Sequence, residues 1–170
     1  MIVLLNGTLG VGKTTIGRTL SQTTENSVFL DGGELTWMNP FNPKKQEDVL
    51  FVFNLFKILA REYKNKGLTN FFISYEIETP EALEFLQKQL ASIDPEFHAF
   101  RLTADEESVF KRIKKRAHVN WEQELHRAKE LMMIHEIPTA KNKLGIIVET
   151  SNQSSADVIK SIARTLELLS

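Results

Sequence analysis

The chain has 170 residues, of which 42% are hydrophobic and 25% charged, a balance that predicts a globular protein with one core. Its formal net charge of −1 argues against a dedicated nucleic-acid partner, because such proteins usually carry a basic excess. The sequence contains no cysteine, which excludes disulfides and thiolate metal sites.

A membrane partner is not expected either. The most apolar stretch, residues 49–60, is interrupted by Asn54 and Lys57 and is shorter than the roughly 20 residues that a spanning helix needs. The run at residues 2–5 is too short for the core of a signal peptide. We therefore expect a cytoplasmic protein that is a monomer or a homodimer.

Short apolar runs alternate with helical patterns, which is typical of a parallel sheet covered by helices on both faces. The first, third and fifth runs are apolar at nearly every position, which predicts strands buried on both sides. Nothing in the sequence divides the chain, so residues 1–170 are expected to form a single α/β domain. The five expected strands are residues 2–6, 27–30, 70–75, 97–102 and 145–149.

Helix boundaries follow from prolines and capping residues. Pro43 and Pro80 each follow a good capping residue, so each is expected to be the first residue of a helix. Thr103 and Glu106 have the spacing of a capping box. The last helix should turn one apolar stripe toward the sheet, formed by Val158, Ile162, Leu166 and Leu169.

Residues 7–14, with the sequence GTLGVGKT, match the phosphate-binding pattern G-x-x-x-x-G-K-[ST] at every fixed position. The match follows an apolar run and opens a helical pattern, where the positive end of the helix favours anions. Lys13 is expected to reach the β- and γ-phosphates of ATP, and the Thr14 hydroxyl to coordinate Mg²⁺. The expected nucleotide-binding residues are Gly7, Leu9, Gly10, Val11, Gly12, Lys13, Thr14 and Thr15.

The additional glycine at position 10 gives the loop the form G-x-x-G-x-G-K-T. This form resembles the branch of P-loop proteins that includes nucleoside monophosphate kinases, shikimate and gluconate kinases and chloramphenicol phosphotransferase. More narrowly, residues 6–15, 28–32 (VFLDG) and 37–41 (WMNPF) resemble a group of bacterial nucleotide kinases. The resemblance implies a three-layer α/β/α fold with five parallel strands in the order 2-3-1-4-5 and a small lid.

Acidic residues stand where the expected second and third strands end. In the resembled kinases, an acid at the place of Asp31 acts as a base or holds a metal-bound water, which implies a catalytic and acceptor-binding role for Asp31. Alternatively, Asp31 only starts a turn. Glu34 is a second candidate that an exposed position explains equally well. The relatives' acid after the third strand is replaced by Ser74 and Glu76, which either serve Mg²⁺ through water or end the strand in solvent.

Two aromatic residues, Trp37 and Phe41, lie in a segment that two prolines restrict. Near the catalytic carboxylate, such aromatic faces are suited to stack on a planar acceptor. They are equally suited to fold back onto the apolar residues of the helix after Pro43. The sequence leaves both interpretations open.

Residues 111–116 include five cations, and Arg112 and Arg116 share one helix face. In the resembled kinases, Arg-x-x-x-Arg on this helix leads into a mobile lid. The resemblance implies that Arg112 lies by the adenine, that Arg116 contacts the phosphates and that the lid spans about 116–121. Arg127 matches a further arginine that faces the phosphates or the acceptor, and residues 150–154 match the loop that packs the adenine. A solvated helix face and a polar connection are the simpler alternatives.

These features together predict an ATP-dependent phosphotransferase that moves the γ-phosphate to a hydroxyl or phosphate of a small molecule. A nucleoside or nucleotide is the favoured acceptor. The alternatives are an antibiotic or other metabolite kinase, an acceptor-independent ATPase and a nucleotide-binding protein without turnover. Residues 142–145 (NKLG) faintly resemble the guanine-reading Asn-Lys-x-Asp of GTPases, but Gly145 replaces the aspartate, which favours ATP. His118, beside the expected lid, is expected to be a surface residue rather than a catalytic one, and His98, His126 and His135 lack metal-ligand spacing.

Overall fold

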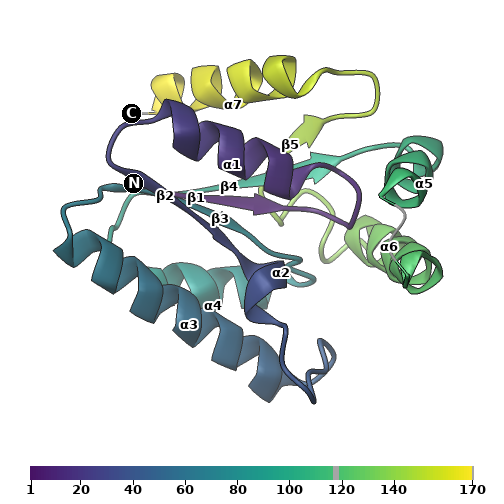
Figure 1. The fold of residues 1–170 in the computed structure, drawn as a ribbon, viewed down its shortest axis with the longest axis horizontal. Coiled ribbons are helices and arrows are strands. Elements are labelled where there is room, and N and C mark those ends of the chain that lie inside the picture. The colour runs from purple at the N-terminus through teal and green to yellow at the C-terminus, as the bar shows by residue number, and fades with distance from the viewer. Residues whose placement is uncertain (117–118, 170) are drawn as a thin grey trace.

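A five-stranded parallel sheet forms the centre of the molecule in the computed structural model, which describes residues 1–116 and 119–169. The strand order is β2-β3-β1-β4-β5, as expected, and each neighbouring pair is parallel (Figure 1). All carboxyl ends therefore lie at one edge of the sheet. The strands are β1 (Ile2–Asn6), β2 (Ser27–Asp31), β3 (Asn70–Ser74), β4 (Phe97–Thr103) and β5 (Ile146–Glu149).

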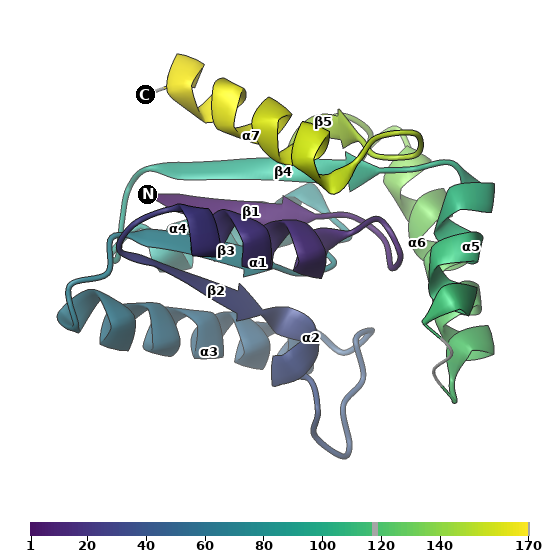
Figure 2. The same ribbon diagram turned by 45° about the horizontal axis from the view of Figure 1, so that its top comes forward.

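Helices cover both faces of the sheet and extend past its carboxyl edge. One face is covered by α1 (Lys13–Thr23) and α7 (Ser155–Leu169), and the other by α3 (Gln46–Asn65) and α4 (Pro80–Leu90) (Figure 1). Figure 2 shows α5 (Glu106–Lys115) and α6 (Trp121–Glu136) beyond the strand ends, while the short α2 (Gly32–Leu35) continues β2. Within the described ranges, no helix combines the length and the apolarity needed to cross a bilayer.

The central strand supplies both hydrophobic cores, because successive side chains of a strand point to opposite faces. Ile2 and Leu4 belong to one core, and Val3 and Leu5 belong to the other. All four are fully buried, which fixes the end of β1 and the loop that follows it. The first core is completed mainly by α3 and α4 through Val52, Phe53, Phe56, Leu86 and Leu90, and the second by α1 and α7 through Ile16, Leu20, Val158 and Ile162.

The expectation that the fifth strand is buried on both sides is wrong. Ile146 and Ile147 are 43% and 46% exposed, and in β5 only Val148 is buried. The reason is position, since β5 pairs only with β4 and forms one edge of the sheet. Strands β1 and β3 are buried as their composition predicts.

Two of the expected helix starts are also wrong. Helix α3 begins at Gln46 instead of Pro43, because Asn42 forms a turn in which its side chain accepts from the N–H of Lys44 at 2.9 Å. Helix α5 is capped by Asp105 instead of Thr103, which is still part of β4.

Other helix expectations are confirmed. Pro80 opens α4, and the Thr79 hydroxyl accepts a hydrogen bond from the N–H of Ala82 at 3.2 Å. The stripe of α7 is buried at Val158, Ile162 and Leu166, whereas the side chain of Leu169 lies outside the described ones.

Candidate active site

The loop between β1 and α1 has the backbone that a phosphate loop requires. Gly7, Gly10 and Gly12 have φ angles of 134°, 81° and 105°, which residues with a side chain rarely adopt. A Cβ at Gly7 would lie 2.4 Å from the carbonyl oxygen of Leu102, so this position has no room for one. Gly12 precedes α1 without a side-chain cap, which leaves the first N–H groups of that helix available to an anion.

Lys13 is 9% exposed, and its ammonium group lies over this loop. Its Nζ donates to the carbonyl oxygens of Gly7 and Thr8 at 2.8 and 3.0 Å, and lies 2.9 Å from a carboxylate oxygen of Glu76. Glu76 follows β3, so the pair joins the phosphate loop to the next strand of the sheet. The β- and γ-phosphates of a nucleotide would compete with Glu76 for this cation.

Oxygen donors from three elements meet beside the loop. The hydroxyl of Thr14 donates to one carboxylate oxygen of Asp31 at 2.9 Å, and the hydroxyl of Ser74 donates to the other at 2.9 Å. Carboxylate and hydroxyl oxygens are hard ligands that suit Mg²⁺, which keeps several waters and also binds substrate phosphates. The residues present therefore fit Mg²⁺, and Thr14, Asp31 and Ser74 are the residues that would hold it. Among residues 1–116 and 119–169, no cluster of three acids or histidines forms a separate cage.

Asp31 is held at this position from two sides. It is the last residue of β2 and pairs in register with Ser74 of β3. It is also the cap of α2, because its Oδ1 accepts from the N–H of Gly33 at 3.1 Å. The turn that the sequence offered as one interpretation of Asp31 is therefore present, and the same residue also lies beside the phosphate loop, where its catalytic role stays a prediction. Glu34 is exposed on α2.

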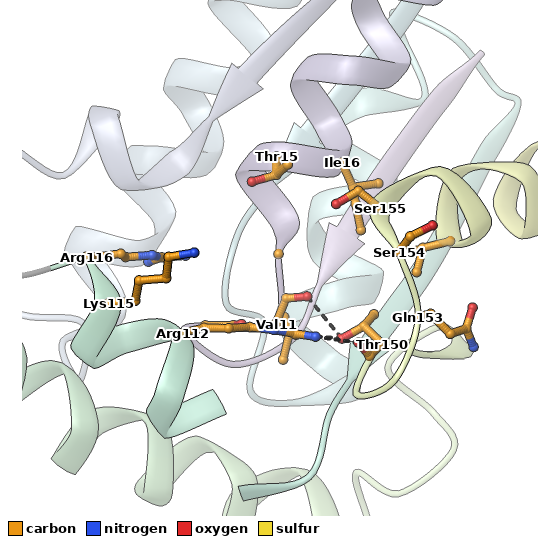
Figure 3. Close-up of a pocket in the computed structure, with 13 residues that line it drawn as sticks. Val11, Thr15, Ile16, Arg112, Lys115, Arg116, Thr150, Gln153, Ser154 and Ser155 are labelled. Atoms are coloured by element: carbon orange, nitrogen blue, oxygen red, sulfur yellow. Dashed lines mark hydrogen bonds between the residues drawn. The ribbon is translucent and has the colours of Figure 1, made fainter. Parts of the chain in front are cut away.

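A cavity of about 590 Å³ lies on one side of the loop, between α5 and the start of α7 (Figure 3). Arg112 reaches across it from α5 and donates to the Thr150 hydroxyl at 3.0 Å and the Ser151 carbonyl at 3.3 Å. The Thr150 hydroxyl in turn donates to the carbonyl of Val11 at 3.2 Å. The volume falls in the range of about 300–1,000 Å³ that is typical of ligand sites. The loop at 150–154 and Arg112 thus both line a cavity that adjoins the phosphate loop, and their contact with a nucleotide base stays a prediction.

A second cavity, of about 510 Å³, lies over the phosphate loop itself. It shares Gly10, Gly12, Thr15 and Arg116 with the first, so Arg116 stands between them. Residues 117–118 of the expected lid at 116–121, and with them His118, lie outside the described residues. The second cavity is also lined by Lys13, Thr14, Asp31, Glu34, Trp37 and Glu76.

A third cavity, of about 230 Å³, adjoins the second and shares Leu9, Gly33 and Glu76 with it. Phe41 lines this cavity and also packs against the core on the α3 side. Trp37 is instead 87% exposed and lines the second cavity. Of the two aromatic residues, Phe41 alone folds back onto the protein, and it still leaves part of its surface to the cavity.

Arg127 lines the third cavity and is held by two carboxylates. It forms ion pairs with Glu78 and with Glu130, the latter at 2.7 Å, and Lys44 contacts the other oxygen of Glu130 at 2.7 Å. Hydrogen bonds from Lys44 and Arg127 lower the pKa of Glu130 to about 2. Three residues of this cluster were not expected from the sequence: Glu78, Lys44 and Glu130. Only the three-residue spacing of Arg127 and Glu130 on a helix gave any signal.

A buried polar group also fixes the edge of the sheet. The side chain of Asn6 donates to the carbonyls of Ile77 and Leu144 at 3.2 Å each, and accepts from the N–H of Gly7 at 2.7 Å. Nε2 of His135 on α6 lies 3.0 Å from the same Ile77 carbonyl. A carbonyl only accepts hydrogen bonds, so Nε2 carries the proton. These contacts tie α6 and the segment after β3 to the phosphate loop.

His135 should make stability depend on pH. Burial lowers the pKa of its imidazole below the ordinary 6.5. The unfolded chain therefore binds a proton at a pH where the native protein does not, and stability falls as the pH drops below about 6.5. We expect His135→Gln, which keeps a donor for Ile77, to show a shallower loss of the free energy of unfolding than wild type. Urea denaturation across this pH range measures the difference, and parallel profiles would contradict the expectation.

Arg116→Ala should lower kcat about tenfold or more while leaving ATP affinity within a few-fold. A cation that meets the transferring group stabilises charge that develops in the transition state, and contributes less to the ground state. Steady-state kinetics together with calorimetry of a non-hydrolysable ATP analogue separate the two effects. Lys111→Ala, on the same helix but away from the first two cavities, is the control. An unchanged kcat would leave Arg116 as a solvated surface residue.

Several solved structures share the fold of this chain. A sugar kinase from Janibacter sp. superposes with a TM-score of 0.74 at 17% identity, covering 98% of this chain and 94% of the other. A gluconokinase from Sinorhizobium meliloti gives 0.68 at 16% identity, with 98% and 94% covered. The tunicamycin resistance protein of Deinococcus radiodurans gives 0.65 at 18% identity, with 97% and 94% covered. At these identities, the likeness shows a shared fold.

The sequence itself carries the family assignment. No curated protein sequence matches the chain. The family described as AAA domain matches residues 3–132, from the first strand through most of α6, and the chain belongs to this family.

Proposed function

We propose that the protein is an ATP-dependent kinase that moves the γ-phosphate of ATP to a hydroxyl or phosphate of a small molecule, with a nucleoside or nucleotide as acceptor. The observation that carries the proposal is the row of three adjoining cavities around the phosphate loop. The first shares residues with the second, and the second shares residues with the third. A base, a polyphosphate and an acceptor fit this row in the order that phosphoryl transfer needs.

In this proposal, each residue near the loop has one task. Lys13 and Arg116 stabilise the charge on the transferring group, and Thr14 helps to hold Mg²⁺. Asp31 accepts the proton of the acceptor hydroxyl while the acceptor oxygen bonds to the γ-phosphorus and ADP leaves. Asp31 lies at the boundary of the second cavity, 2.9 Å from the Thr14 hydroxyl, which supports this role.

The third cavity supports a small acceptor. Its volume of about 230 Å³ is below the range of about 300–1,000 Å³ typical of drug-sized ligands. Phe41 offers an aromatic surface there, and Trp37 lines the adjoining second cavity. Aromatic surfaces suit a planar group such as a base. Several proteins of the same fold are named as kinases of small molecules, among them the gluconokinase and the sugar kinase.

ATP turnover across a panel of acceptors tests the proposal. ADP formation is followed with Mg·ATP alone and with each acceptor, and mass spectrometry identifies any phosphorylated product. We expect turnover that depends on one class of acceptor. Equal ADP formation without acceptor would indicate an ATPase, and tight nucleotide binding without turnover would indicate a binding protein.

A further inference from the structure

We infer that the acceptor is an uncharged molecule whose hydroxyl or amino groups donate hydrogen bonds to Glu76 and Glu78, and that an anionic acceptor is rejected. The inference rests on the proposed function and selects a substrate class within it. It follows from the charges around the third cavity, from the partners of those charges and from the effect of nucleotide binding on one of them.

The third cavity has an excess of negative charge. Among the described residues that line it, the charged ones are Glu76, Glu78 and Arg127, two acids against one base. The remaining lining is largely apolar, together with the phenol of Tyr75. Burial, followed by the nearby charges of Glu76 and Glu78, raises the pKa of Tyr75, so this phenol stays neutral. The lining offers hydrogen-bond acceptors on an apolar background.

Arg127, the one cation among the described residues that line the third cavity, already forms two ion pairs. Arg127 contacts Glu78 and Glu130, and its side chain is only 18% exposed. Although partial burial opposes it, hydrogen bonds to Glu130 and Glu78 raise the pKa of Arg127. A phosphate or carboxylate of an acceptor would have to take this guanidinium from two carboxylates. Glu130 would keep Lys44, but Glu78 would lose its partner, which is costly in a partly buried place.

Nucleotide binding should increase the negative charge further. Glu76 lines both the second and the third cavity, and its carboxylate pairs with Lys13 at 2.9 Å. The β- and γ-phosphates need the same ammonium group, so they displace Glu76 from it. The carboxylate is then left facing the acceptor cavity beside the phosphates. Because an ionised carboxylate only accepts hydrogen bonds, the acceptor has to supply the donors.

A binding experiment with matched ligands tests the inference on the full chain. The protein is first saturated with Mg²⁺ and a non-hydrolysable ATP analogue, and calorimetry then measures the affinity for uridine, adenosine and glucose and for the monophosphate ester of each. We expect at least one uncharged compound to bind about tenfold or more tightly than its own phosphate ester. A preference for the esters, or no binding of any uncharged compound, would overturn the inference.

Variants of Glu76 and Glu78 provide a second test of the inference. Glu76→Gln should lower the affinity for the preferred acceptor about tenfold, the typical loss for a hydrogen bond to a charged group. It should also raise the affinity for the ATP analogue about two- to fivefold, because the carboxylate of Glu76 no longer competes with the phosphates for Lys13. Glu78→Gln should weaken the acceptor and leave the analogue unchanged. Glu81→Gln, exposed on α4 and outside this cavity, is the matched control.

The two proposals fail differently. If the ATP analogue does not bind the folded wild-type chain, the proposed function is wrong. If the analogue binds and the phosphate esters are preferred, the kinase proposal stands and the inference about the acceptor is wrong. An acceptor affinity that Glu76→Gln and Glu78→Gln leave unchanged would equally remove these residues from acceptor recognition. Thermal denaturation of Glu78→Gln, whose carboxylate pairs with Arg127, separates lost recognition from lost stability.

Discussion

Lys13→Ala is expected to lower turnover by about 10³-fold or more, the size of effect seen for a cation that contacts a transferred phosphoryl group. Such a loss corresponds to about 4 kcal/mol of transition-state stabilisation. The effect is large because the ammonium group lies over the loop, where solvent is largely excluded and electrostatic interactions are stronger than in water. ADP formation under saturating Mg·ATP and acceptor measures it.

The variant should remain folded. Lys13 lines the second cavity and belongs to neither hydrophobic core, and its partner Glu76 is about one-third exposed and can be hydrated. Circular dichroism and thermal denaturation verify this point. Lys88→Ala removes an exposed lysine of α4 that pairs with Glu84, and it should leave turnover unchanged. Full activity of Lys13→Ala would exclude the phosphate loop from the reaction.

The strands and the phosphate loop were predictable because their signals are local. Residues 2–5 are apolar at successive positions, as is typical of a strand buried on both faces. The three glycines of the loop have positive φ angles, which glycine adopts readily and other residues rarely do. Their spacing in the sequence therefore indicates this backbone conformation directly. The strand order itself followed from a family resemblance that these loop residues carried.

The surroundings of the site were less predictable, because they depend on contacts between distant segments. Glu76 meets Lys13 from 63 positions away, and Lys44 meets Glu130 across 86 positions, so no spacing rule reveals either pair. The start of α3 was missed for a local reason, since the turn around Asn42 competes with a helix that Pro43 would open. The exposure of β5 depends on its place at the sheet edge, which composition does not encode.

Asp31→Asn is expected to lower phosphoryl transfer by about 10²- to 10⁴-fold, the usual contribution of a positioned general base. The amide retains one oxygen that can accept from Ser74 and from the N–H of Gly33, so the cap of α2 and the end of β2 should persist. What is lost is the negative charge that takes the acceptor proton and faces the Thr14 hydroxyl.

Asp31→Asn should therefore lower turnover while leaving the affinity for the nucleotide nearly unchanged. In the proposed mechanism, the nucleotide is held mainly by the N–H groups of the loop and by Lys13, and the substitution touches none of them. Calorimetry should therefore give an affinity for the ATP analogue close to wild type. Glu34→Gln is the matched control, because Glu34 lines the same cavity from exposed α2 and should change kcat little. If Asp31→Asn weakened nucleotide affinity and left kcat intact, Asp31 would belong to nucleotide binding through the metal, and the base would have to be sought at Glu34 or Glu76.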